Sequence, residues 1–366
     1  MKLKYKYMKI IITSVSAGAG HVRAANAMEA YLKEVHEVKH IDLMDYSTKW
    51  FKHIYADKYI DLINNHPKLW KALYNISDKP TSKEIYKIRR WMEYKLHNKF
   101  FTYLKEANPD VIVSTHFMPP EILIRFREKE KLNFKIHVVV TDFDVHYLWV
   151  HQMADHYFVA GENAKQKLIK YGIEAHKITI SGIPIMPNFF IEQNKGFLFN
   201  KWNLHTDKKT ILLMAGGAGV GELDIVADTI LNNFNNIQVI ALSGKNENLL
   251  NKLNNLSHKY GNRILPVGFT NEVHELMSIS DLVVTKPGGL STSECIYLKK
   301  PMVLINPIPG QEELNAETIE NLGLGKLSLN LIKDLTLVIN NLSQYHNNFE
   351  KLNIVDSLNI IRNFYG

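Results

Sequence analysis

Residues 281–316 read DLVVTKPGGLSTSECIYLKKPMVLINPIPGQEELNA, and two strand–turn–helix patterns follow one another in them. An apolar run at 282–285 ends at Pro287-Gly288-Gly289, and a polar helix start follows. A second apolar run at 302–305 ends at Pro309-Gly310 and opens another helix. In a parallel sheet such turns lie at one edge. Helix N-termini carry unpaired N–H groups and partial positive charge, so this edge suits phosphates and sugar hydroxyls.

The same alternation of buried strands and helices extends over most of the 366 residues. It begins with an apolar strand at 9–15, a glycine-rich turn at 16–21 and a helix at 24–35, and it restarts at 210–214 before a second glycine-rich turn. We therefore predict an α/β protein with two doubly wound parallel sheets. The expected parts are a first domain (1–187), a linker (188–205), a second domain (206–335) and C-terminal helices (336–366) that can cross back to the first domain.

The composition is that of a globular protein, with 46% hydrophobic and 22% charged residues and a formal net charge of +7. This charge favours anionic partners without choosing among them. The single cysteine, Cys295, excludes an intramolecular disulfide and is expected to be a small buried apolar residue. No run approaches the roughly 18 apolar residues of a membrane-spanning helix, so any membrane association is expected to be peripheral.

Residues 46–101 form an insertion in which aromatic and basic side chains alternate with a helical period. Two interpretations remain open from the residues alone. The segment can lie at a membrane interface, with rings at headgroup depth and cations against anionic lipid. It can equally be a pair of amphipathic helices that pack on the first sheet. No nucleic-acid-binding motif is present, so no nucleic-acid partner is expected.

Four polar residues of the first half lie in or beside turns that follow predicted strands. His21 follows the first glycine turn, Asp142 and His116 each end a strand, and His146 lies close behind Asp142. A histidine or carboxylate at this edge of a sheet can act as a general base. Each can also be an ordinary turn residue. No metal-ligand motif such as H-E-x-x-H is present, so no metal ligand set is expected.

In the second half, the turn containing Gly216, Gly217 and Gly219 can let a backbone approach a phosphate. It lacks the Gly-Lys-Ser/Thr ending of a P-loop, and no acid closes the next strand as in a dinucleotide site. Glu294 can accept hydrogen bonds from a ribose diol, although acidic residues are also common at helix starts.

Six motifs occur in the order seen in one family of enzymes: 16–21 (SAGAGH), 140–142 (VTD), 181–184 (SGIP), 214–219 (MAGGAG), 285–289 (TKPGG) and 309–316 (PGQEELNA). In this order they resemble the monogalactosyldiacylglycerol synthases and processive diacylglycerol glucosyltransferases. The resemblance spans roughly His21 to Ala316. The chain is also similar, more distantly, to the peptidoglycan lipid-linked N-acetylglucosaminyltransferases.

This resemblance implies a GT-B fold, with two facing α/β domains and a cleft between them. It implies inverting transfer of a hexose, glucose or galactose, from a UDP-sugar to diacylglycerol or a glycosyldiacylglycerol, with no metal or other cofactor. The protein would act in the cytoplasm, peripherally on the inner face of the membrane and against anionic lipid. Alternatives are another lipid-linked acceptor such as an undecaprenyl-linked sugar, a UDP-sugar epimerase, or a non-catalytic nucleotide-sugar sensor.

The resemblance also assigns roles to residues. Asp142 is the preferred base for the acceptor hydroxyl, with His21 orienting it or sharing the proton, and the reverse assignment stays open. The expected donor-binding residues are Gly216, Gly217, Gly219, Gly288 and Gly289 near the diphosphate, Phe269 and Thr270 near uracil, Glu294 on ribose, and Gln311 and Glu312 on the hexose. The expected acceptor and membrane residues are Trp50, Phe51, Trp70, Arg89, Arg90, Trp91, His116 and His146.

One departure from the family pattern concerns the phosphates. Many members have a basic residue after the Gly-x-Pro-x motif, whereas Met186 stands there in this chain. The phosphate contact expected at that point is therefore lost or replaced. Lys286, which lies beside the glycine turn at 287–289, is the expected substitute.

Overall fold

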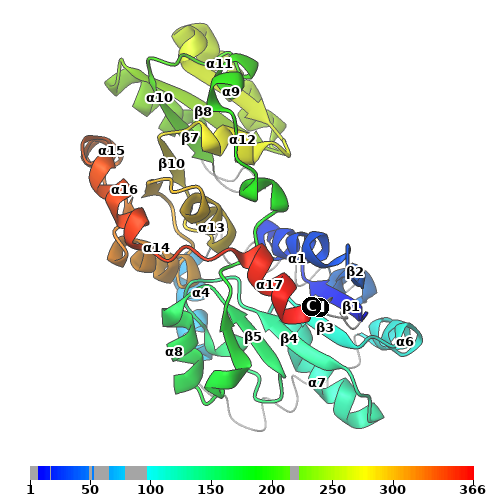
Figure 1. Ribbon diagram of the computed structural model, residues 1–366. Helices are drawn as coiled ribbons and strands as arrows, with labels where there is room; N and C mark the ends of the chain where they lie inside the picture. The colour runs from blue at the N-terminus through cyan, green and yellow to red at the C-terminus, as the bar shows by residue number, and fades with distance from the viewer. Residues whose placement is uncertain (1–6, 17, 49–51, 53–65, 79–96, 215–221) are drawn as a thin grey trace. The chain divides into compact units, whose positions relative to one another are not determined.

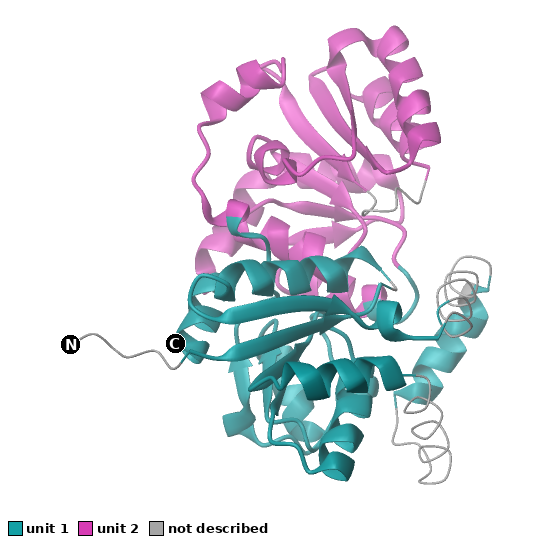
Figure 2. Ribbon diagram, turned by 90° about the vertical axis from the view of Figure 1, so that its right-hand side faces the viewer, with its two compact units in different colours: residues 1–187, 308–311, 355–366 teal, residues 188–307, 312–354 magenta. Residues whose placement is uncertain are grey.

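The computed structural model describes residues 7–16, 18–48, 52, 66–78, 97–214 and 222–366 (Figure 1). These residues form two compact units, coloured separately in Figure 2. Unit 1 comprises residues 1–187, 308–311 and 355–366, and unit 2 comprises residues 188–307 and 312–354. Each unit has one six-stranded sheet, and every strand pairing in both sheets is parallel. The predicted α/β class is confirmed.

The sheet of unit 1 has the strand order β2-β1-β3-β4-β5-β6. Its strands are β1 (Lys9–Ser14), β2 (Glu37–Asp42), β3 (Val111–Ser114), β4 (Lys135–Val139), β5 (His156–Val159) and β6 (Ile178–Ile180). Its helices are α1 (Ala19–Leu32), α4 (Pro67–Ser77), α6 (Asn98–Ala107), α7 (Met118–Glu130), α8 (Glu162–Lys170) and α17 (Ser357–Tyr365), with the short 3-10 helices η1 (Leu43–Tyr46), η3 (Tyr147–Trp149) and η4 (Ala175–Lys177).

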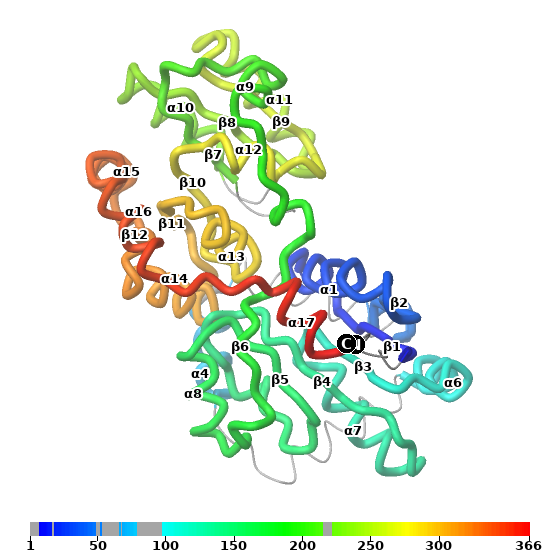
Figure 3. The backbone as a smooth tube through the Cα atoms, in the orientation of Figure 1, coloured from blue at the N-terminus to red at the C-terminus, as the bar shows by residue number. Residues whose placement is uncertain are grey.

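The sheet of unit 2 has the order β12-β11-β10-β7-β8-β9, and its strands are labelled in Figure 3. Its strands are β7 (Lys209–Met214), β8 (Ile237–Gly244), β9 (Ile264–Gly268), β10 (Leu282–Thr285), β11 (Met302–Leu304) and β12 (Gly325–Leu327). The helices are α9 (Lys195–Lys201), α10 (Leu223–Asn233), α11 (Glu247–Tyr260), α12 (Val273–Ser278), α13 (Gly289–Tyr297), α14 (Gln311–Asn321), α15 (Leu331–Asn340) and α16 (Leu342–Lys351), with the 3-10 helices η5 (Pro187–Phe190) and η6 (Gly261–Arg263).

Both sheets bury apolar side chains on their two faces, as parallel sheets require. In β1, Ile10, Ile11 and Ile12 are each at most 1% exposed, and successive strand residues point to opposite faces. Ile11 packs in a cluster with residues of α6 and α7, including Phe100 and Phe126. This double-sided burial explains why the strands read as continuous apolar runs in the sequence.

The strand orders place a topological switch point in each sheet, where the chain reverses its direction of progress across the sheet. In unit 1 this point lies between β1 and β3, and in unit 2 it lies between β7 and β10. In open α/β sheets, the loops at the carboxyl ends of the two strands beside such a point diverge and leave room for a ligand. His21 lies in the first turn of the helix that follows β1, His116 follows β3, and Gly288 and Gly289 follow β10.

Residues 188–205 were expected to be a linker, but the structure gives them helices and includes them in unit 2. Helix α9 lies within this range. The side chain of Asn194 caps it by accepting a hydrogen bond from the N–H of Phe197 at 3.0 Å, and Leu198 is buried. One side-chain cap and one buried side chain thus stabilise a short helix whose sequence has no strong period.

The C-terminal residues from Val355 onward belong to unit 1, whereas α15 and α16 belong to unit 2. Helix α17 contacts α1, as the trace in Figure 3 shows. The Arg362 guanidinium donates to the carbonyl oxygen of Tyr31 at 2.8 Å and pairs with Glu34. The hydroxyl of Tyr365 lies 2.7 Å from Nδ1 of His137 in β4. The last helix of the chain is therefore part of the first α/β unit.

Candidate active site

The first candidate group lies at the switch point of unit 1 and centres on His21. The sequence placed His21 in a loop, but α1 begins at Ala19, so His21 lies in the first turn of the helix. The N-cap residue Gly18 is extended, and no residue between 19 and 24 prevents helix formation. The side chain of His21 is half-buried, and its position is set by the backbone of α1.

Two oxygen atoms determine which nitrogen of His21 carries the proton. Nδ1 lies 2.8 Å from the carbonyl oxygen of Thr115, which follows β3, and 2.9 Å from Oγ1 of Thr141, which follows β4. A carbonyl oxygen can only accept, so Nδ1 must carry the hydrogen. In the neutral ring Nε2 then has the free lone pair. Thr115 completes the arrangement by donating its own hydroxyl to the carbonyl oxygen of His21 at 2.8 Å.

The surroundings of His21 keep its ring neutral near pH 7. Burial lowers the pKa of His21 to about 4, and the hydrogen bond to the Thr115 carbonyl opposes this only in part. The ring of His116 lies edge-on to that of His21, with 4.6 Å between centroids. Burial, and then the neighbouring His21, hold the pKa of His116 well below its usual value. Both imidazoles are therefore uncharged, and His21 is able to accept a proton through Nε2.

His116 and Asp142 are the other predicted residues of this edge. His116 is 1% exposed. Its Nδ1 accepts a hydrogen bond from the N–H of Met118 at 3.1 Å, which stabilises the start of α7. Asp142 is half-buried and directly follows Thr141. The structure thus brings His21 and His116 together and adds the residue before Asp142 to the same group.

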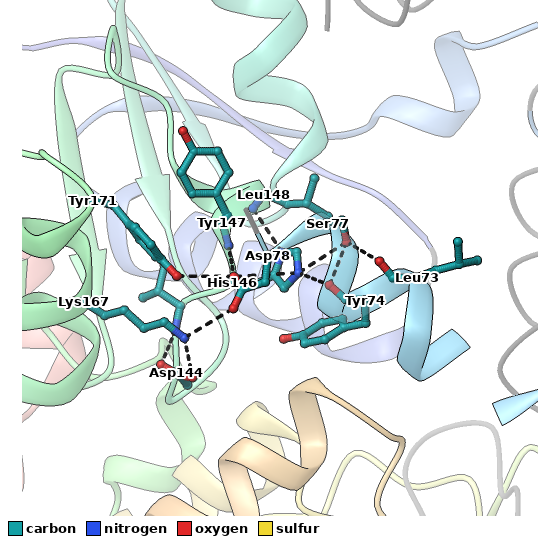
Figure 4. Close-up of polar contacts among 11 residues, drawn as sticks. Leu73, Tyr74, Ser77, Asp78, Asp144, His146, Tyr147, Leu148, Lys167 and Tyr171 are labelled. Atoms are coloured by element: carbon teal, nitrogen blue, oxygen red, sulfur yellow. Dashed lines mark hydrogen bonds and ion pairs between the residues drawn. The ribbon is translucent and has the colours of Figure 1, made fainter. Parts of the chain in front are cut away.

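His146 belongs to a different group of contacts, which is drawn in Figure 4. Its Nδ1 accepts from the N–H of Leu148 at 3.1 Å, so Nε2 carries the hydrogen and donates to the carbonyl oxygen of Tyr74 at 2.9 Å. Burial lowers the pKa of His146. Nε2 thus holds the C-terminal end of α4 and Nδ1 caps η3, which is a structural arrangement rather than that of a free base.

Asp78, the residue after α4, anchors the same helix. Its Oδ1 accepts from the N–H of Tyr147 at 2.7 Å and from the hydroxyl of Tyr171 at 3.4 Å. Lys167 of α8 lies 4.0 Å from its Oδ2 and 2.7 Å from Asp144. Burial, then the charge of Asp78, raises the pKa of Tyr171 to about 12, so the phenol remains a hydrogen-bond donor. Helix α4 is thereby fastened to the loop after β4 and to α8 (Figure 4).

Helix α4 has two apolar faces with different surroundings. Tyr74 is buried and packs on His146 with 4.2 Å between ring centroids, and Trp70, one turn earlier, is half-buried. Leu69, Leu73 and Ile76 lie on another stripe, and they are 55%, 44% and 71% exposed. Among the described residues, no helix has the length and apolarity needed to span a membrane.

The second candidate group lies at the switch point of unit 2. Gly288 is the N-cap of α13, and Glu294 is a fully buried carboxylate within the same helix. A Cβ on Gly288 would lie 3.7 Å from Oε1 of Glu312, so the turns after β10 and β11 are close together. The amide of Asn315 donates to the carbonyl oxygen of Pro287 at 3.1 Å and holds the two turns in place.

Three further predicted donor residues lie in unit 2. Phe269 is 61% exposed after β9, and Lys245 lies over its ring at 5.3 Å from the centroid. The hydroxyl of Thr270 accepts from the N–H of Glu272 at 3.0 Å, so it also serves as a turn residue. Lys286 is half-buried at the end of β10. An exposed ring beside a turn is suited to stacking on a planar base.

Residues 308–311, between β11 and α14, belong to unit 1. Gly310 has a φ of +92°, which favours glycine, and Gln311 is the first residue of α14. Glu312 follows it and is 8% exposed. Gln311 and Glu312, predicted to bind the hexose, thus stand at a helix start directly after a turn.

Several predicted residues lie outside the described part of the chain: Trp50, Phe51, Arg89, Arg90, Trp91, Gly216, Gly217 and Gly219. Within the described part, no three His, Cys, Asp or Glu residues are grouped to hold a metal ion. Cys295 is fully buried, and burial raises the pKa of its thiol, as expected for an unreactive apolar residue.

Sequence reasoning missed the residues that orient the others. The carbonyl of Thr115 and the hydroxyl of Thr141 orient His21, and Asp78 anchors α4. A backbone carbonyl leaves no trace in residue type, so Thr115 could not have been found. Thr141 offered a weak signal, because it stands at a strand end beside Asp142.

Comparison with known proteins gives matches for both halves of the chain. Residues 21–185 match the family model described as monogalactosyldiacylglycerol (MGDG) synthase. Residues 210–355 match the model described as glycosyltransferase family 28 C-terminal domain. The first match begins at His21, after β1, and includes Asp142, and the second includes Glu294, Gln311 and Glu312.

Individual proteins are similar over most of their length. A processive diacylglycerol beta-glucosyltransferase of Bacillus mycoides (strain KBAB4) is 30% identical over 321 residues, which cover 87% of this chain and 81% of the relative. Among solved structures, MurG of Acinetobacter baumannii superposes with a TM-score of 0.62 at 11% identity, covering 98% of this chain and 99% of that one. UDP-GlcNAc 2-epimerase of Neisseria meningitidis bound to UDP-GlcNAc gives 0.59 at 14% identity, covering 97% and 98%. These two structures bear on the fold alone.

Proposed function

Because this chain belongs to the family of monogalactosyldiacylglycerol synthases and processive diacylglycerol glucosyltransferases, we propose that it transfers a hexose from a UDP-sugar to diacylglycerol or a glycosyldiacylglycerol. The observation that carries this proposal is the arrangement around His21. A neutral imidazole with a free Nε2 stands at a topological switch point, in the half that matches the MGDG synthase model.

In the proposed mechanism, the acceptor hydroxyl loses its proton while its oxygen attacks the anomeric carbon from the face opposite UDP. The C–O bond to the diphosphate breaks as the new glycosidic bond forms, so the anomeric configuration inverts. The N-terminus of α13, with Gly288 and Gly289, offers N–H groups to the negative charge that develops on the leaving diphosphate. Lys286 at the end of β10 can add a cation there.

The geometry of His21 favours it as the base over Asp142. Its Nδ1–H is held by Thr115 and Thr141, which leaves Nε2 as the only ring atom able to accept a proton. A pKa near 4 keeps the ring available in its neutral form at physiological pH. Asp142, one residue from Thr141, then supplies the negative charge that stabilises the imidazolium. This reverses the preference that the sequence alone suggested.

Donor recognition is proposed for unit 2 and the residues that flank it. Glu294 would accept hydrogen bonds from the ribose, Phe269 and Thr270 would contact uracil, and Gln311 with Glu312 would bind the hexose. The closeness of Gly288 to Glu312 supports this division, because phosphate-facing and sugar-facing turns must be neighbours. The residues themselves do not distinguish glucose from galactose.

Peripheral membrane association is proposed for the exposed stripe of α4. Leu69, Leu73 and Ile76 form a continuous apolar surface, and Lys68 and Lys71 are exposed on the same helix. An exposed apolar stripe on a helix that also carries cations suits an anionic bilayer surface. The lipid acceptor resides in such a bilayer, which gives this surface a role in the reaction.

Three rivals make different experimental predictions. Transfer to another lipid-linked sugar would require that lipid in the assay. An epimerase would change the hexose without consuming lipid, and a sensor would bind without turnover. Release of UDP should be measured with UDP-glucose or UDP-galactose, with and without diacylglycerol in phosphatidylglycerol liposomes. The proposal expects release that depends on diacylglycerol, and lipid-independent release or none would contradict it.

A further inference from the structure

Trp70 and Tyr74 of α4 contact the turn at residues 308–311. Both segments belong to unit 1 (Figure 2). The indole N–H of Trp70 donates to the carbonyl oxygen of Pro309 at 3.0 Å. Trp70 and Tyr74 lie one helical turn apart, with 6.1 Å between ring centroids, so they form a pair on one side of the helix. This pair meets the turn directly before Gln311.

Tyr74 fits against Gly310 so closely that no side chain could be added there. A Cβ on Gly310 would lie 2.7 Å from Cδ1 and 2.8 Å from Cγ of Tyr74, well inside van der Waals contact. Gly310 also has a φ of +92°, which a residue with a Cβ rarely adopts. The ring of Tyr74 therefore covers a residue whose left-handed backbone conformation leads the chain into α14.

Tyr74 is itself held in place from the opposite direction. Its ring packs on His146 at 4.2 Å, and its carbonyl oxygen accepts from Nε2 of that histidine at 2.9 Å. Asp78 and Lys167 fasten the end of the helix (Figure 4). A chain of contacts thus runs from the loop after β4 through α4 to Pro309 and Gly310.

We infer that Trp70 and Tyr74 are positioning residues for the donor hexose: they hold the turn at 309–310 and thereby orient Gln311, the proposed sugar-binding residue that follows. This inference rests on the proposed function. Trp70 acts through a hydrogen bond to a backbone carbonyl, and Tyr74 acts through a ring against a glycine. Neither needs to touch the substrate. Their loss should affect recognition of the hexose and leave recognition of the uridine and diphosphate unchanged.

The test compares the binding of a UDP-hexose with that of UDP in the purified full-length chain. Tyr74→Leu removes the flat ring, and Gly310→Ala introduces a Cβ that the ring cannot accommodate. Each should weaken the binding of UDP-glucose, or of UDP-galactose if that is the sugar transferred, on the order of tenfold, which corresponds to one lost sugar hydrogen bond. The dissociation constant of UDP, measured by calorimetry, should stay within about twofold.

Two conservative variants separate positioning from folding. Tyr74→Phe keeps the ring and should bind both ligands as the natural protein does. Trp70→Phe keeps an aromatic ring but removes the indole N–H and part of the ring surface, and it should weaken UDP-hexose binding by about two- to tenfold, the order expected for one hydrogen bond. Tyr103→Leu, a half-buried tyrosine of α6 that packs on Tyr46, is the matched control and should change neither constant.

The inference is overturned if Tyr74→Leu and Gly310→Ala bind UDP-hexose normally, or if the affinities for UDP and UDP-hexose fall by equal factors. It is also overturned if Tyr74→Phe loses as much as Tyr74→Leu. Because the readout is equilibrium binding, it does not depend on turnover. If the natural protein bound UDP-hexose but transferred nothing, the proposed function would be contradicted. The role of Trp70 and Tyr74 could still be tested by the same binding measurements.

Discussion

His21, the proposed base, is oriented by groups that do not themselves react. The Thr115 carbonyl fixes its tautomer, Thr141 adds a second oxygen at Nδ1, and burial lowers its pKa to about 4. Low basicity is a disadvantage for a base, and it is offset if an anionic group stabilises the imidazolium as it forms. In the proposed mechanism Asp142 is that anionic group, so the proposal needs both residues.

Replacing His21 by Gln should lower kcat about 100- to 10,000-fold, because no group remains to accept the hydroxyl proton. The affinity for UDP should stay unchanged, since the proposed donor residues lie elsewhere. Steady-state kinetics and calorimetry on the same preparation measure both. Asp142→Asn should cost less than His21→Gln. If Asp142→Asn lowered kcat more than His21→Gln, the carboxylate of Asp142 would be the better candidate for the base.

Thr141→Val removes one of the two oxygens at Nδ1 and keeps the shape of the side chain. The Thr115 carbonyl still fixes the tautomer, so kcat should fall by no more than about tenfold, the value of a single hydrogen bond. Thr141→Ser retains the hydroxyl and should restore activity. If Thr141→Val were as inactive as His21→Gln, the carbonyl alone would be insufficient to orient the ring.

At the scale of elements, α4 carries an exposed apolar stripe, Leu69, Leu73 and Ile76. Leu73→Glu combined with Ile76→Glu should weaken binding to phosphatidylglycerol vesicles at least tenfold, because two charges replace apolar side chains that would enter the bilayer. Flotation of vesicles with the protein measures this. Thr102→Glu, at an exposed position of α6, is the control for added negative charge. Equal losses for the control and the double variant would indicate a general charge effect instead of insertion.

Helix α17 should contribute substantially to the stability of unit 1. Ile361 is fully buried, so Ile361→Ala should reduce the free energy of unfolding by about 2–5 kcal/mol. Asn363→Ala changes an exposed side chain of the same helix and should have an effect within about 0.5 kcal/mol. Urea denaturation followed by circular dichroism distinguishes the two. A negligible loss for Ile361→Ala would mean that the helix is dispensable.

The elements differ in how well the sequence predicts them. Strands such as β1 and β10 are continuous apolar runs that end at glycine-containing turns. The run and the turn residues together are enough to predict them from the sequence. Helix α9 depends on one Asn194 cap and one buried leucine, and β12 has only three residues, so neither leaves a periodic signal. The predicted start of α1, Ala24, is five residues after the observed start at Ala19, because residues 16–21 were interpreted as a glycine-rich turn. The donor turns were recognised as motifs, whereas the contacts of Trp70 and Tyr74 with residues 309–310 join distant parts of the sequence.

At the scale of the whole molecule, buried histidines make stability depend on pH. Burial lowers the pKa of His137 to about 3 and that of His156 to about 4, and the two rings are 5.8 Å apart. Between these values and 6.5 the unfolded chain binds protons that the native state does not. Stability is therefore fully present above pH 6.5 and decreases as the pH falls toward 4.

Urea denaturation between pH 7.5 and 4.5 should show this decrease, and His156→Gln should make it shallower by removing one titrating group. His258→Gln, at an exposed position, should leave the slope unchanged. A constant unfolding free energy over this range would show that the buried histidines titrate in the folded protein as they do in water.

The most direct test of the central claim is to identify the lipid product. The purified chain should be incubated with UDP-glucose and, separately, UDP-galactose in phosphatidylglycerol liposomes that contain diacylglycerol, and the lipid extract should be analysed by mass spectrometry. We predict a hexosyldiacylglycerol in one of the two reactions, formed in an amount equal to the UDP released and absent with His21→Gln. Unmodified diacylglycerol in both reactions, or an altered hexose on UDP with no glycolipid, would contradict the account.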